Sequence, residues 1–117
     1  MPAKKKPAQH TIVINGRPVP KGRPRLGRRG RVFTPEKTLI AEAAIREAWD
    51  GPIFDGSVSV IVVFNESTTE VTVREYDGVK SKLRGDIDNY VKTLMDGLNG
   101  VAWIDDKQVH HVEAIKE

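Results

Sequence analysis

The chain has 117 residues, 38% of them hydrophobic, and it contains no cysteine. This length favours a single domain around one modest core, and the lack of cysteine excludes a disulfide framework, a thiolate zinc site and a cysteine nucleophile. No apolar run approaches the roughly 20 residues of a membrane span, and residues 1–7 lack the apolar core of a signal peptide. We therefore expect a cytoplasmic protein.

Charge is distributed unevenly along the chain. Residues 1–35 hold ten Lys or Arg and no acid, whereas residues 36–117 hold nine bases and sixteen acids, so a segment of +10 precedes one of −7. A basic arm beside an acidic body suits a polyanionic partner, with the acids available to recruit a cation. The alternative is a solubilising tail.

The N-terminal third begins with a Lys-rich stretch, residues 1–9, which we expect to be a disordered tail. Residues 10–15 are β-branched and predict a first strand, and Asn15-Gly16 predicts a turn. Residues 17–32 then hold seven bases and three prolines, which indicates an irregular binding loop. The same arginines could instead cap helix ends or pair with acids.

A helix is predicted over residues 35–49. Thr34 would be its N-cap, Pro35 its first residue and Glu36 an acid at its positive end. Mostly small apolar residues recur at helical spacing and should form the packed stripe. Its members are Leu39, Ile40, Ala43, Ala44, Glu47 and Ala48.

Two strands are expected next. Residues 57–64 become continuously apolar, as in a central strand covered on both faces. Residues 70–76 contain Val71-Thr72-Val73 and predict a further strand.

A second helix should begin near Asp88, its expected N-cap. Its apolar residues fall within one arc of the helix and its polar residues within the other. Lys92 lies one turn after Asp88, and Asp86 precedes Asp88 by two residues on extended chain, so the three side chains could converge. The apolar arc comprises Tyr90, Val91, Leu94, Met95 and Leu98.

The last part of the chain turns at Asn99-Gly100, passes Trp103 and Asp105-Asp106, and is predicted to end in a strand over residues 108–115. Each of these carboxylates has a structural alternative, because Asp is common as a helix cap and in solvated turns. An EF-hand is excluded, since Tyr90 and Val91 would occupy positions for a ligand and a glycine. His110 and His111 would point to opposite faces of a strand, which disfavours joint chelation.

Hard cations such as Mg²⁺ take oxygen ligands, usually one or two carboxylates together with phosphate oxygens. A basic protein with clustered carboxylates and a lysine therefore suggests phosphodiester chemistry. Trp49 and Trp103 could stack on bases, but at apolar positions they more often belong to the core.

The chain resembles the RusA-type Holliday junction resolvases, small dimeric endonucleases of phages and bacteria. The resemblance rests on Asp86-Ile87-Asp88-Asn89 followed by Lys92, then Asp96-Gly97-Leu98, then the stretch from Trp103 through Asp105-Asp106 to Val109. It extends upstream to residues 16–25 and to the Thr34-Pro35 helix entry. It covers nearly the whole chain.

The resemblance implies an α+β fold, in which a single small domain, residues 10–117, has a mixed β-sheet packed against two main helices. It also implies a homodimer that binds branched DNA, has no membrane association, and acts in a bacterial or phage-infected cell in recombination and repair. The activity would be Mg²⁺-dependent, with Mn²⁺ as a substitute, and would nick a four-way junction symmetrically.

Carried over by position, the family's metal-binding and catalytic carboxylates match Asp86, Asp88 and Asp106, and its active-site lysine matches Lys92. Asp105 and Asn89 are assigned supporting positions around that site. In the basic loop, phosphate contacts are expected from Lys21, Arg23 and Arg25, and also from Arg28 and Arg29.

One departure from the family lies immediately before the first aspartate. Many members have Lys-Pro or Arg-Pro there, whereas this chain has Arg84-Gly85. Two other functions remain open: a nuclease for other branched or single-stranded DNA, and a catalytically silent DNA-binding module of the same fold.

Overall fold

The computed structural model describes residues 8–22, 25–26, 30, 32–78 and 81–117. The chain falls into two compact units, Met1–Asp77 and Gly78–Glu117. Of the expected N-terminal tail, residues 1–7 lie outside the described residues, and Gln9 already belongs to the first strand.

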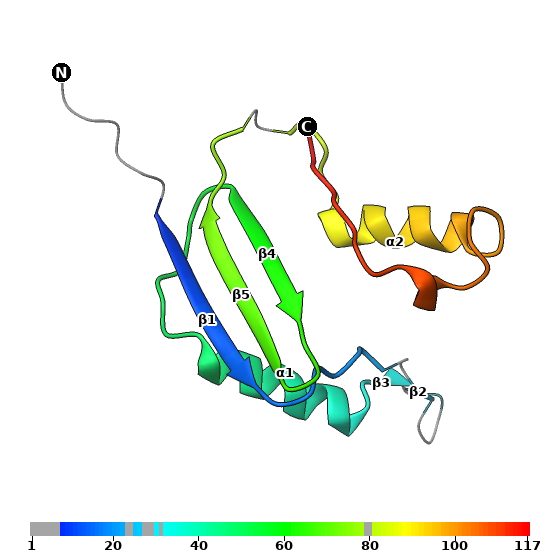
Figure 1. The fold of residues 1–117 in the computed structure, drawn as a ribbon, viewed down its shortest axis with the longest axis horizontal. Helices are drawn as coiled ribbons and strands as arrows, with labels where there is room; N and C mark the ends of the chain where they lie inside the picture. The colour runs from blue at the N-terminus through cyan, green and yellow to red at the C-terminus, as the bar shows by residue number, and fades with distance from the viewer. Residues whose placement is uncertain (1–7, 23–24, 27–29, 31, 79–80) are drawn as a thin grey trace. The chain divides into compact units, whose positions relative to one another are not determined.

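A three-stranded antiparallel sheet forms the body of the first unit (Figure 1). Its strands are β1 (Gln9–Asn15), β4 (Val58–Phe64) and β5 (Thr68–Glu75), in the order β1-β5-β4. Ile12 pairs with Val71 on one side of β5, and Val62 pairs with Val71 on the other. With two helices, this sheet confirms the α+β class, although its described strands are all antiparallel rather than mixed.

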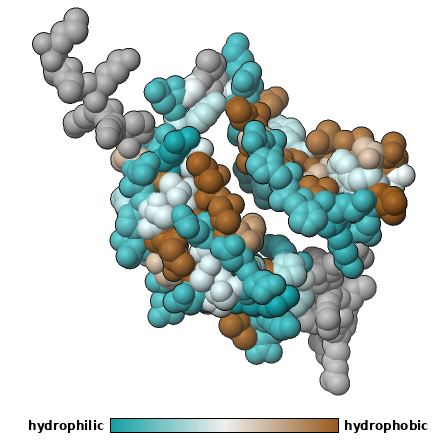
Figure 2. Space-filling view, viewed as in Figure 1, coloured by the Kyte–Doolittle hydropathy of each residue, from teal (hydrophilic) through white to brown (hydrophobic). Residues whose placement is uncertain are grey.

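The predicted strand over residues 57–64 exists, but its predicted central position is wrong. A tight turn after β4 folds β5 back against it, where the amide of Asn65 donates to the carbonyl of Thr68 (2.8 Å). Because β1 pairs with the far side of β5, the more polar β5 is central and β4 is the edge. Hydrophobic residues are exposed over this sheet (Figure 2), and Phe64 of β4 is 68% exposed.

Helix α1 (Glu36–Ala48) follows the basic segment, residues 17–32, and lies against β1 (Figure 1). Pro35, not Thr34, is its N-cap, because the Pro35 carbonyl accepts the amides of Thr38 (3.1 Å) and Leu39 (3.2 Å) and so closes the first turn. The predicted packed stripe is also wrong: the buried side chain is that of Thr38, and of the predicted members only Ala48 is half-buried, whereas the others are exposed, namely Leu39, Ile40, Ala43, Ala44 and Glu47.

Between β1 and α1, residues predicted as an irregular loop contain two short strands. β2 (Arg25–Leu26) pairs antiparallel with β3 (Val32–Phe33). Residues 17–22 form no helix or strand, as predicted.

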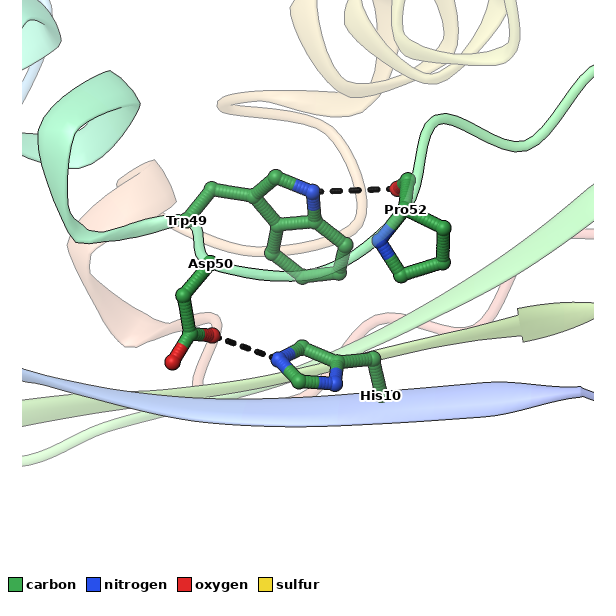
Figure 3. Close-up of polar contacts among 4 residues, drawn as sticks. All are labelled: His10, Trp49, Asp50 and Pro52. Atoms are coloured by element: carbon green, nitrogen blue, oxygen red, sulfur yellow. Dashed lines mark hydrogen bonds and ion pairs between the residues drawn. The ribbon is translucent and has the colours of Figure 1, made fainter.

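The end of α1 is tied to β1 by a side-chain cluster (Figure 3). His10 Nε2 lies 2.6 Å from Asp50 Oδ1, and the His10 ring meets the ring of Trp49 edge-on with centroids 5.0 Å apart. The Trp49 indole N–H donates to the carbonyl of Pro52 (3.1 Å). Trp49 is half-buried, so it serves the packing of the unit, as predicted.

The pair formed by His10 and Asp50 makes the stability of the fold depend on pH in the acidic range. The hydrogen bond from His10 lowers the pKa of the Asp50 carboxyl from its usual 3.8. A lowered folded-state pKa stabilises the protein above the unfolded pKa, and this contribution disappears as pH falls through the folded pKa. We expect the native chain to have a slightly higher Tm than Asp50→Asn at about pH 5, and the difference to shrink towards zero below about pH 3.8.

Thermal unfolding monitored by circular dichroism at several pH values measures this difference. Asp55→Asn, a substitution of another exposed aspartate in the same unit, is the matched control and should show no such convergence. A difference between native and Asp50→Asn that stays constant down to pH 2.5 or so would contradict the linkage.

The second unit consists of α2 (Ile87–Leu98), the 3-10 helix η2 (Asp106–Gln108) and connecting chain. The apolar arc of α2 is confirmed in part, since Val91, Met95 and Leu98 are half-buried whereas Leu94 is 61% exposed. The predicted strand over residues 108–115 is wrong: η2 takes Gln108, and residues 109–117 form no helix or strand. Across the described residues, neither helix has the length and apolarity needed to cross a bilayer.

Candidate active site

Two of the predicted catalytic carboxylates lie at the start of α2. Asp86 is the N-cap, with extended backbone (φ −72°, ψ 141°), and Asp88 lies in the first turn. The prediction that Asp88 is the N-cap is therefore wrong, because the carbonyl of Asp86 accepts the amides of Asn89 (3.1 Å) and Tyr90 (3.3 Å). Both carboxylates are exposed at the positive end of the helix, where negative charge is stabilised.

The carboxylate of Asp86 makes no capping hydrogen bond to the helix. An N-cap aspartate usually spends its side-chain oxygens on the amides of the first turn. Asp86 therefore supplies the cap through its backbone alone, and its carboxylate oxygens are free of that structural duty.

Lys92 is exposed on α2, four residues after Asp88 and therefore one turn further along the same side. Asn89, assigned a supporting position, is exposed too, and its carbonyl accepts the hydroxyl of Thr93 (3.2 Å). Asp88 and Lys92 thus lie on one side of α2, with Asp86 at the N-cap before them.

The Asp105-Asp106 pair has two distinct structural roles. Asp105 is the N-cap of η2: its Oδ1 accepts the amide of Lys107 (2.9 Å), and the Gln108 side chain accepts the amide of Asp105 (3.1 Å) in a capping box. Asp106 is half-buried, and its Oδ1 accepts the indole N–H of Trp103 (2.7 Å). Sequence reasoning assigned Trp103 to the core and missed this bond.

Asp106 lies in the same compact unit as Asp86 and Asp88 but on a different element. Within the described ranges, no set of three or more His, Asp or Glu side chains is placed to hold a metal ion. The structure therefore places Asp86 and Asp88 at the start of α2, Lys92 in the middle of α2 and Asp106 on η2. The histidines engage locally, His110 with the Gln108 carbonyl (2.7 Å) and His111 with Glu113 (2.9 Å).

Of the predicted DNA-binding residues, Lys21 is the one whose side chain is described. Its Nζ lies 3.7 Å from Glu42 Oε1 of α1, and the Lys21 side chain is 75% exposed. An ion pair this exposed contributes little to stability, so the ammonium group remains accessible to a phosphate. The backbone of Arg25 lies in β2. Arg23, Arg28 and Arg29 lie outside the described residues.

The following residue anchors this basic segment to α1. The amide of Gly22 donates to the hydroxyl of the buried Thr38 (3.0 Å). A Cβ at Gly22 would lie 2.8 Å from Pro35 Cγ, so the backbone passes directly over the start of the helix. The position of Lys21 is therefore set by α1, which the sequence did not indicate.

Comparison with known protein families gives a match over nearly the whole chain. The family model described as Endodeoxyribonuclease RusA matches residues 15–117, which includes every predicted site residue. Searches of curated proteins and of solved structures gave no significant match. Because the match spans nearly the whole chain, this protein belongs to the endodeoxyribonuclease RusA family.

Proposed function

We propose that this protein is a Mg²⁺-dependent endodeoxyribonuclease that resolves four-way DNA junctions by paired symmetric nicks. Membership of the family implies a Holliday junction-resolving endonuclease. The observation that supports catalysis by this chain is the start of α2, where the Asp86 carboxylate is not used as a cap and Asp88 follows in the first turn.

Asp86, Asp88 and Asp106 are proposed as the metal ligands, although the described side chains form no ready-made group of three metal-binding acids. Their donor chemistry fits, because Mg²⁺ takes carboxylate oxygens and usually needs only one or two protein carboxylates beside phosphate oxygens and water. Asp86 and Asp88 provide two at one helix entry, and Asp106 keeps Oδ2 for a third contact while Trp103 binds Oδ1. A bound divalent cation lowers the pKa of water and neutralises charge on phosphoryl oxygens; Mn²⁺ would substitute for Mg²⁺.

Lys92 would act on the DNA itself. Its exposed ammonium group lies one helical turn from Asp88. There it would contact a non-bridging oxygen of the scissile phosphate and stabilise the extra negative charge of the transition state.

The basic segment, residues 17–32, would bind the DNA backbone. Each phosphate neutralised by Lys or Arg releases counterions, which makes binding strong, sequence-tolerant and dependent on salt. Lys21, Arg23 and Arg25 are proposed as direct contacts, with Arg28 and Arg29 contributing further charge.

We expect the triple alanine variant of Lys21, Arg23 and Arg25 to bind junction DNA more weakly and with a shallower salt dependence. Each lost phosphate contact should reduce the slope of log K against log salt by about 0.9. Filter binding or fluorescence anisotropy in EDTA, from low to moderate salt, measures both quantities. A triple variant with native affinity and slope would refute the role of this segment.

A homodimer would deliver the two cuts. A four-way junction is pseudo-symmetric, and a C2 dimer presents two equivalent active sites to it. Mass measurement in solution by light scattering tests this, and a monomer that nonetheless makes paired nicks would contradict it.

One comparison tests the function against its alternatives. Labelled four-way junction, flap, duplex and single-stranded DNA are each incubated with the protein in Mg²⁺, Mn²⁺ or EDTA. Paired symmetric nicks confined to the junction, and abolished by EDTA, are expected. Cutting of flaps or single strands instead would identify a different structure-selective nuclease, and binding without cutting in any metal would identify a silent module.

A further inference from the structure

Gly85, the residue immediately before Asp86, is held on both sides by side chains of its own compact unit. Its amide donates to the hydroxyl of Tyr90 (3.0 Å), and its carbonyl accepts the ammonium group of Lys116 (3.1 Å). Tyr90 comes from the first turn of α2, and Lys116 comes from the segment that follows η2.

These two bonds act on the two peptide planes that flank Gly85. The Tyr90 hydroxyl fixes the plane that carries the Gly85 amide, and Lys116 fixes the plane that joins Gly85 to Asp86. The two bonds together restrain φ and ψ of Gly85, and with them the direction in which the chain enters Asp86.

The Tyr90 ring also needs glycine at this position. A Cβ at residue 85 would lie 2.8 Å from Tyr90 Cζ and from its hydroxyl oxygen. The ring therefore lies directly against the glycine backbone, and any larger residue would displace it.

Lys116 is suited to this task because it is half-buried. A charged donor to a carbonyl forms one of the stronger hydrogen bonds, and partial burial shields it from water. A second bond holds the same segment in place, since the hydroxyl of Ser81 donates to the carbonyl of Glu117 (3.0 Å).

The family resemblance leads us to expect proline at this position, whereas this chain has Gly85. A proline before the aspartate fixes φ through its ring, whereas glycine leaves the backbone permissive. The two bonds restrain the backbone from outside, and one of them uses the Gly85 amide, which proline does not have.

We propose that Tyr90 and Lys116 are positioning residues that clamp Gly85 and thereby orient the carboxylate of Asp86 for catalysis. The proposal rests on the proposed function for its effect on cutting, although the clamp itself is independent of that function. Neither residue is assigned a contact with DNA or metal.

The test uses Tyr90→Phe and Lys116→Met in the full chain, each of which removes a hydrogen-bonding group with little change in shape. Hydrogen exchange measured by mass spectrometry should become faster in peptides covering residues 84–88 and stay unchanged in the last two turns of α2. Because small misplacements of catalytic groups are costly, the single-turnover cutting rate at saturating junction should fall about 10-fold. Junction affinity in EDTA should not change.

Two controls make the result specific. Lys82→Met, which removes an exposed lysine of the same unit, should leave exchange and cutting unchanged. Lys116→Arg keeps a charged donor and should restore most of the lost rate.

Unchanged exchange at residues 84–88 in both variants would overturn the clamp. A Lys116→Met variant that loses junction affinity by the same factor as its cutting rate would also overturn it, because Lys116 would then be a DNA contact. If the native chain cuts no DNA, the proposed function fails, and the exchange measurement still decides whether the clamp exists.

Discussion

Replacement of Asp86 by Asn is expected to abolish cutting of a four-way junction while leaving the fold and junction binding intact. Loss of a group that only supports a metal ligand typically costs 10- to 100-fold, so loss of a ligand charge itself should cost at least about 100-fold. The fold should be unaffected, because Asp86 caps α2 through its backbone and Asn is as good an N-cap as Asp. The measurements are the single-turnover cutting rate in Mg²⁺, junction affinity in EDTA, and Tm.

Asp106→Asn should behave in the same way, because the Asn side-chain oxygen still accepts the indole N–H of Trp103. Asp96→Asn is the matched control: Asp96 is exposed on the same helix but two turns from Asp88, and its substitution should leave cutting within about 2-fold of native. Native nicking by both Asp86→Asn and Asp106→Asn would refute the assignment of the carboxylates.

Local sequence patterns predicted most elements of this fold. The β-branched residues of β1 and the period-3.6 amphipathic pattern of α2 are strong local signals. Helix starts were each misplaced, by one residue for α1 and by two for α2. At α2 both Asp86 and Asp88 are good cap residues, and which carbonyl accepts the first-turn amides depends on the backbone rather than on residue type.

The position of β4 could not be predicted in the same way. A continuous apolar run is typical of a covered strand, yet strand order depends on which segments pair across the chain. β1 and β5 are separated by more than fifty residues, and their pairing makes β5 central. Nothing in the sequence of β4 itself distinguishes these outcomes.

Around the candidate site, the sequence identified candidate residues by their type and spacing, but it did not indicate the long-range contacts. Asp86, Asp88 and Lys92 follow from helical geometry and from family resemblance. The bond from Lys116 to Gly85 joins residues 31 apart. Lys116 lies in a segment without helix or strand, so no sequence periodicity predicts this contact. The hydrogen bond of the Tyr90 hydroxyl was not predicted, because the sequence assigns Tyr90 to the apolar arc of the helix.

Replacement of Lys92 by Met should also eliminate most of the cutting activity. Removal of one group that stabilises developing charge typically costs about 10²- to 10³-fold in rate. Met keeps the length of the side chain and is a good helix former, and Lys92 is exposed, so Tm should be unchanged. Lys92→Arg keeps the charge but replaces a compact ammonium group with a planar fork, and it should retain an intermediate rate.

The kinetic parameters of Lys92→Met identify when the ammonium group acts. An interaction made only in the transition state lowers kcat and kcat/KM equally, whereas one made equally with bound DNA raises KM and leaves kcat unchanged. We expect the first pattern, because the proposed role is to stabilise charge that appears on the phosphoryl oxygens during cleavage. Lys107→Met, the same substitution on the exposed surface of η2, is the control and should change neither parameter by more than about 2-fold. A Lys92→Met variant with native kcat would remove Lys92 from the reaction and leave the metal-bound carboxylates as the whole of the proposed chemistry.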